Sequence, residues 1–310
     1  MATADAKLRV WDSRGAEVLS QHVAGQVWDL CSLPVDGTAI VYGPGVDRSL
    51  RGWSLGRTAL VMVADLWTGR TGWISAVAAH HGAGRPLIFV AVEKGDVRLF
   101  DAREGTDRAV GRIGETGNPV VALLASTGAG PVYLGAVQRD GALGLWNLHR
   151  RGLSPVARFI ARSPASWILI DAAEREAVAT VDGHLLLFRI PAGFTERLSA
   201  RSRGLELIRT ITLDSAVTAA CYDDQLRLIF VGQASSVKIY DRSFVLVQVI
   251  SLGAGVRKLA SLGHGRIVAA TDAGSVGLAV LRPPSSGAVI DGVVVPGNGR
   301  PISLPAVPLA

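Results

Sequence analysis

Lys7-Leu8-Arg9-Val10-Trp11-Asp12 is the stretch that decides the fold, because versions of it return through the whole chain. It alternates apolar and polar residues and ends in an aromatic residue and an acid, the pattern of a half-buried β-strand. The later versions are Leu50–Ser54, Val97–Asp101, Leu143–Asn147, Leu185–Arg189, Val237–Asp241 and, most altered, Val276–Val280.

The spacing of these versions indicates a structural repeat. Their matching positions are 11, 53, 100, 146, 188, 240 and 280, so successive intervals run from 40 to 52 residues. A period of about 40–45 residues with four strands per unit is typical of a propeller blade. We therefore predict an all-β fold, a seven-bladed β-propeller of four-stranded antiparallel blades, in a single domain over residues 1–310.

The blade that contains Trp11 poses a problem of closure, since only its last two strands precede the first full repeat. We expect that blade either to be built from both chain termini or to be left incomplete for a strand from another chain. The segment Arg300–Leu309, within a C-terminal tail over 296–310, is the candidate for its inner strand. Three prolines limit that segment to a short or edge strand.

Composition bounds the class of protein. Of 310 residues, 49% are hydrophobic and 36 are Gly, which suits a β-rich protein with many tight turns. The two cysteines, Cys31 and Cys221, fall in different repeats and are expected to be buried thiols, which favours a reducing compartment. The sequence shows no secretory signal and no apolar run of about 20 residues, so we predict a cytoplasmic protein without a membrane segment.

Several residues of the first complete repeat resemble the WD-repeat, or β-transducin-like, family. They are His22, Val27, Leu30, Pro34-Val35-Asp36-Gly37 and Trp53. In that family a histidine, an acidic hairpin residue, the tryptophan and a Ser or Thr form a structural hydrogen-bond network. The resemblance gives Asp47 the acidic place, whereas Tyr42 and Gly43 stand where the hydroxyl is expected, so the network should be incomplete. The family implies a non-catalytic binding module or scaffold subunit of a larger complex.

No residue set has the pattern of a catalytic or metal site. The sequence lacks a P-loop, a paired Cys-x-x-Cys and a Gly-x-Ser-x-Gly, and turn chemistry explains its hairpin aspartates. The adjacent His80 and His81 precede Gly82 and are expected in an exposed turn. We therefore predict no catalytic residue, no metal and no cofactor; a propeller hydrolase with a channel active site is the alternative.

Trp73 is the strongest candidate for partner binding. It immediately precedes a predicted inner strand, where side chains in the WD-repeat family face the upper mouth of the channel. An exposed tryptophan there is a plausible anchor for a partner. Arg257 and Lys258 begin a later inner strand and add positive charge, while Trp28 is expected to pack between blades. The positions equivalent to Trp73 are Gln26, Pro119, Ser166 (or Trp167, if the register shifts by one), Ala216 and Gly255.

The long interval ending at 240 contains a basic insertion over 191–206. It carries Arg197, Arg201 and Arg203 in a chain whose net charge is +6. We expect protein partners that are acidic or donate a strand. Nucleic-acid association through this loop is an alternative that we consider second, because only Phe194 offers an aromatic platform among the arginines.

Overall fold

The fold is described by a computed structural model of the chain. The described residues are 7–11, 17–23, 27–45, 47–56, 59–68, 72–82, 85–113, 118–127, 130–160, 165–191, 205–273, 276–280, 292–295 and 302–303. All regular structure in them is β-strand, which confirms the all-β prediction. They fall into two compact units, one within Met1–Val10 and Leu19–Thr210 and the other within Trp11–Val18 and Ile211–Ala310.

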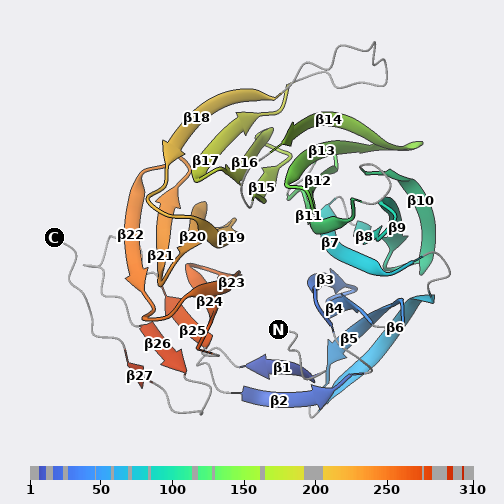
Figure 1. The fold of residues 1–310 in the computed structure, drawn as a ribbon. Helices are drawn as coiled ribbons and strands as arrows, with labels where there is room; N and C mark the ends of the chain where they lie inside the picture. Colours follow the sequence, from blue (N-terminus) through green and yellow to red (C-terminus); the bar gives the residue numbers. More distant parts are fainter. Residues whose placement is uncertain are drawn as a thin grey trace. The chain divides into compact units, whose positions relative to one another are not determined.

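Four antiparallel four-stranded sheets make up most of the first unit, and their strands follow one another in chain order (Figure 1). The first sheet contains β3 (Cys31–Val35), β4 (Thr38–Pro44), β5 (Ser49–Leu55) and β6 (Leu60–Thr68). The second contains β7 (Ile74–Gly82), β8 (Arg85–Val92), β9 (Asp96–Asp101) and β10 (Thr106–Arg112). The third contains β11 (Val120–Ala125), β12 (Tyr133–Gln138), β13 (Ala142–His149) and β14 (Gly152–Ile160). The fourth contains β15 (Ser166–Asp171), β16 (Glu176–Val181), β17 (His184–Arg189) and β18 (Glu206–Thr212).

The second unit holds two more sheets. One is four-stranded, with β19 (Val217–Asp223), β20 (Leu228–Gln233), β21 (Ser236–Asp241) and β22 (Leu246–Ser251). The other is five-stranded, with β23 (Val256–Gly263), β24 (Arg266–Thr271), β25 (Val276–Val280), β26 (Gly292–Val295) and β27 (Ile302–Ser303). Near the N-terminus, β1 (Lys7–Trp11) and β2 (Glu17–His22) form a two-stranded sheet.

The predicted count of seven four-stranded blades is wrong. The described residues form five four-stranded sheets, one five-stranded sheet and one two-stranded sheet. Of the segment Arg300–Leu309 the structure describes Ile302 and Ser303, and these pair with Val294 and Val293 of β26, whereas an inner strand beside Trp11 was expected. Proline at 301 and 305 leaves few residues able to pair, so this strand is a short fifth strand at the edge of its sheet.

The recurring stretch forms the third strand of the six sheets that have four or five strands, and in five of these it supplies a buried aromatic residue. The aromatic residues at the end of this stretch are all less than a tenth exposed: Trp53, Phe100, Trp146, Phe188 and Tyr240. In the first unit the first strands of successive sheets are in contact, β3 with β7, β7 with β11 and β11 with β15. Apolar clusters fill the space between them, as with Phe89, Leu134 and Trp146 between the second and third sheets.

A β-bulge lies near the start of five first strands: β7, β11, β15, β19 and β23. In each, one residue has no partner on the second strand, which bends the strand and redirects the side chains around it. In β15 the shift lies between Trp167 and Leu169, and in β7 between Ile74 and Ala76. Trp167 therefore matches Ile74, and Ser166 is the equivalent of Trp73 without a shift of register.

Two Asp-Gly pairs form the tight hairpins that the sequence predicts. Asp36 and Gly37 have φ angles of 48° and 79°, and Asp182 and Gly183 have 49° and 74°. Two successive residues with positive φ are what a two-residue type I′ turn requires, and glycine accepts this conformation without strain. These turns join β3 to β4 and β16 to β17.

Candidate protein-binding site

Two exposed tryptophans form the centre of the candidate site. Trp28 precedes β3 and Trp73 precedes β7, and their ring centroids are 6.3 Å apart at an interplanar angle of 52°. Their exposed fractions are 41% and 42%, which is high for such large apolar side chains. Trp28 Nε1 donates a hydrogen bond of 3.1 Å to the Ile74 carbonyl oxygen, which fixes one ring against the neighbouring sheet.

Arg48 adds a positive charge to the tryptophan pair. Its guanidinium carbon lies 5.6 Å from the centroid of the Trp73 ring, within the range of a cation–π interaction. Arg48 sits in the turn between β4 and β5 with a φ of 67°, a conformation that an arginine adopts only when its surroundings fix the turn.

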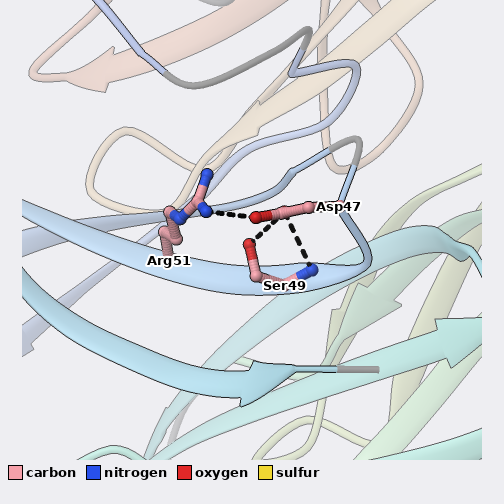
Figure 2. Close-up of polar contacts among 3 residues, drawn as sticks. All are labelled: Asp47, Ser49 and Arg51. Carbon is pink, nitrogen blue, oxygen red and sulfur yellow. Dashed lines mark hydrogen bonds and ion pairs between the residues drawn. The ribbon is translucent and has the colours of Figure 1, made fainter. Parts of the chain in front are cut away.

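Asp47 fixes that turn (Figure 2). Its Oδ1 accepts hydrogen bonds from the Ser49 hydroxyl, at 2.5 Å, and from the Ser49 backbone N–H, at 3.2 Å, while Oδ2 pairs with the Arg51 guanidinium. Burial acts to raise the pKa of Asp47, but the Ser49 hydrogen bonds and the Arg51 charge outweigh it, so the pKa is lowered. The carboxylate is therefore ionised at neutral pH and stabilises the hairpin that carries Arg48.

The described contacts of Asp47 differ from the structural hydrogen-bond network of the WD-repeat family. Asp47 makes its described contacts within its own hairpin, and His22 is exposed at the end of β2. Trp53 is buried in an apolar cluster with Leu8, Val27 and Leu60. Asp47 therefore stabilises the turn between β4 and β5.

A cleft of about 420 Å³ adjoins the tryptophans, and we call it the tryptophan cleft. Val121, the bulged residue of β11, lines it and is 48% exposed, so its floor is apolar. Charge at the cleft comes from Arg139 and Glu93. The other lining residues are Trp28, Trp73, Ile74, Ser75, Pro119 and Val120.

Asp29 links the first and second sheets beneath the cleft. Its Oδ2 accepts a hydrogen bond of 2.9 Å from the Val77 backbone N–H in β7, and its Oδ1 accepts one of 3.0 Å from the Leu30 N–H. The loop that carries Trp28 is thus tied to the sheet that carries Trp73. The two rings are held in place before any partner arrives, which lowers the entropic cost of binding.

The structure places only some of the predicted site residues. Trp73 is exposed as expected, and its equivalent Pro119 lines the same cleft. Arg257 and Lys258 are exposed in the second unit, where Arg257 pairs with Asp272. Outside the described residues lie Gln26, Arg197, Arg201 and Arg203.

Trp28 contacts the neighbouring sheet through Ile74 and Trp73, as expected of a residue between blades, but it remains 41% exposed. Sequence reasoning also missed Arg48, Glu93 and Arg139. All three lie in the hairpin between the second and third strands of their sheets. The strand order offered a signal for them. In an antiparallel sheet this hairpin lies at the same end as the residue before the first strand, which is where Trp73 was predicted.

The prediction of an exposed His80-His81 turn is half wrong. Both residues lie within β7, and His81 is exposed, but His80 is 2% exposed. Within the described ranges, no group of three or more His, Cys, Asp or Glu side chains is placed to hold a metal ion. Nor does this part of the chain contain a helix long and apolar enough to cross a membrane.

Comparison with known proteins gives the fold. No protein-family model matches the chain, and no curated protein matches it by sequence. Among solved structures, Chaetomium thermophilum Raptor is similar over 89% of this chain, with a TM-score of 0.65 and 15% identity. The match covers 26% of the Raptor chain, so this chain spans about a quarter of that protein.

Two further structures are similar over most of their length. A chain of the Mitotic Checkpoint Complex has a TM-score of 0.58 and 15% identity, over 87% of this chain and 77% of that one. Saccharomyces cerevisiae Sqt1 has a TM-score of 0.61 and 10% identity, over 99% of this chain and 92% of Sqt1. These likenesses support a propeller fold of the WD-repeat type, and at such identities they show the fold alone.

Proposed function

We propose that this protein is a non-catalytic protein-interaction module that binds its partner at the tryptophan cleft. The observation that carries the proposal is the pair of tryptophans, each about two-fifths exposed and held rigid beside a cleft. Tryptophan and arginine are the residue types that most often dominate binding energy at interfaces.

The cost of leaving these rings in water argues for a binding role. A tryptophan exposes a large apolar area, and burying such area contributes about 25 cal/mol per Å². Trp28 and Trp73 line the cleft, whereas other large rings of the first two sheets, such as Trp53 and Phe100, are buried. An exposed apolar group of this kind is typical of an interaction site.

The charges around the cleft favour an acidic partner. Arg48 lies over Trp73 and Arg139 lines the cleft, whereas Glu93 is the acid at this place. A partner segment with an apolar side chain next to an Asp or Glu would place the apolar group on the rings and the carboxylate near Arg48 or Arg139. The similar structures belong to proteins that act in complexes, which is consistent with a protein partner.

Selection from a random peptide library displayed on phage tests the proposal. Peptides selected on the whole chain should be enriched in an apolar residue flanked by acids, and Trp73→Ala or Trp28→Ala should weaken their binding roughly tenfold or more. Met62→Ala is the control, because Met62 is 55% exposed on β6 and does not line the cleft. Selected peptides whose affinity is unchanged in both tryptophan variants would refute the proposal.

A further inference from the structure

A second cavity lies between the second and third sheets, with a volume of about 550 Å³. Its walls include Leu87 and Leu99 from the second sheet and Val132 and Leu148 from the third. Leu87, Val132 and Leu148 are partly buried and pack against the apolar cluster between these sheets. The cavity is thus an opening at the margin of the core, with aliphatic walls on both sides.

One buried imidazole, that of His80, lines this cavity. His80 Nδ1 lies 2.6 Å from the carbonyl oxygen of Ser126, and a carbonyl can only accept, so Nδ1 carries the proton and donates. Ser126 is itself fixed, because its N–H donates to the Tyr133 carbonyl oxygen at 2.8 Å and its hydroxyl accepts from the Tyr133 N–H at 3.0 Å. The ring orientation and tautomer of His80 are therefore set by its surroundings.

We infer that the second ring nitrogen, Nε2, faces the cavity. Nδ1 makes the one hydrogen bond found for His80 among the described residues. The fully enclosed side-chain atoms without a partner there are Asn147 Oδ1, Gln233 Oε1 and Gln248 Nε2, and His80 Nε2 is not one of them. Since the residue is 2% exposed and lines the cavity, the small accessible part of its ring opens there.

His80 is neutral at pH 7, so Nε2 is an acceptor. Burial lowers the pKa of His80, and the neighbouring His81 lowers it further, against the opposing effect of the Ser126 hydrogen bond. A ligand that fills this cavity must therefore present a hydrogen-bond donor to Nε2 and an apolar body to the leucines and valine.

We propose that this cavity binds a tyrosine side chain of a partner protein, with its phenol hydroxyl donating to His80 Nε2. A phenol ring is flat and apolar along its length and carries its donor at the tip, which matches the four aliphatic side chains and the His80 acceptor in a lining that is otherwise polar or charged. Phenylalanine fills the same space but leaves the buried acceptor unpaired, which binding penalises. The site is separate from the tryptophan cleft and shares no lining residue with it.

The rim favours a tyrosine with acidic neighbours. Arg85, Arg108 and Arg150 line the cavity together with Asp101, Glu104 and Asp107. Asp107 is already paired with Arg98, which is outside the cavity, and Asp101 Oδ1 accepts from the Arg103 and Glu104 backbone N–H groups. With Asp107 paired to Arg98, three arginines stand against Asp101 and Glu104, an excess of one positive charge.

The experiment titrates the whole chain with N-acetyl-L-tyrosinamide and with N-acetyl-L-phenylalaninamide, followed by the imidazole nitrogen resonances of His80. We expect the tyrosine probe to shift the Nε2 signal and to bind about fivefold more tightly than the phenylalanine probe. His80→Asn keeps a donor near the Ser126 carbonyl and removes Nε2, so it should abolish the preference. His81→Asn is the matched control and should retain it.

A second variant keeps the test decisive if His80→Asn folds poorly. Val132→Phe fills the cavity from its wall and leaves His80 intact, so it should abolish binding of both probes. Equal affinity for the two probes, a preference that survives His80→Asn, or no binding up to the solubility limit of the tyrosine probe would each overturn the proposal. Trp73→Ala should leave the tyrosine preference unchanged, so failure here is distinct from failure at the tryptophan cleft.

Discussion

At the scale of single residues, Asp47 shows how one carboxylate organises a binding surface. It fixes the turn that presents Arg48 to Trp73 through Ser49 and Arg51. The sequence indicated an acid in this hairpin, because Asp is frequent in turns. The contact between Arg48 and Trp73 could not be predicted, since it joins two repeats and depends on how their sheets pack.

Asp47→Ala should lower the free energy of unfolding by about 1 kcal/mol, because it removes charged hydrogen bonds that solvent partly screens. The lowered pKa of Asp47 means that its contribution is present above the ordinary value near 4 and is lost as the pH falls through the folded value. Urea unfolding at pH 7 and at pH 3 measures both effects. Asp96→Ala is the control, since Asp96 is about half exposed in its ion pair with Arg112. A loss of equal size at both pH values would contradict this account.

His80 gives a second loss of stability at low pH. Here protonation gives a neutral buried group a charge, whereas at Asp47 it removes one. Its folded pKa is below the ordinary value, so the unfolded chain takes up the proton first as the pH falls. The contribution of neutral His80 to stability is complete above about pH 6.5 and declines below it. Thermal unfolding between pH 7.5 and 5 should show a smaller decline in His80→Asn than in His81→Asn. Equal declines in the two variants would show that the buried ring does not set this dependence.

At the scale of elements, third strands were predictable and bulges were not. In five of the repeats the third strand contains a buried aromatic residue near its end, and this signal survives variation in the rest of the repeat. A bulge inserts one residue into a strand without a characteristic residue type, as Ser75, Val121 and Arg257 illustrate. The exposure of Val121 at the cleft follows from such a bulge, and no apolar-polar pattern in the sequence indicates it.

Gly144 in β13 is required by the packing of its own strand. A Cβ at this position would overlap the six-membered ring of Trp146, which lies over the backbone at Gly144. Gly144→Ala should therefore lower the free energy of unfolding by about 2 kcal/mol, measured by chemical denaturation. Combining it with Trp146→Leu should remove most of the additional loss, because the clash disappears with the ring. Strict additivity of the two changes would show that the overlap is relieved elsewhere.

At the scale of the whole molecule, the repeat predicted the fold class but not how the last strands pair. The strand β26 (Gly292–Val295) pairs with β25. Ile302 and Ser303 extend that sheet by a fifth strand, which the sequence could not indicate. Two residues carry little pairing information, and their partner is decided by which sheet edge lies within reach of the chain.

If residues 1–310 form one compact domain, as we propose, the radius of gyration in solution should be about 20 Å. The chain unfolded in urea should give about 60 Å under the same measurement. Small-angle X-ray scattering at several protein concentrations measures both. A value well above the compact one in native buffer, independent of concentration, would show that the two units do not form a single body.

The contact between Trp28 and Trp73 has an optical consequence. Two indoles with centroids 6.3 Å apart, on different sheets, are close enough for their excited states to couple. The pair should therefore give a near-ultraviolet circular dichroism signal that disappears in either Trp→Ala variant. The unmodified protein thus carries its own label for the junction of its first two sheets. A partner that binds to these rings, or a separation of the first two sheets, would each change this circular dichroism signal without any added dye.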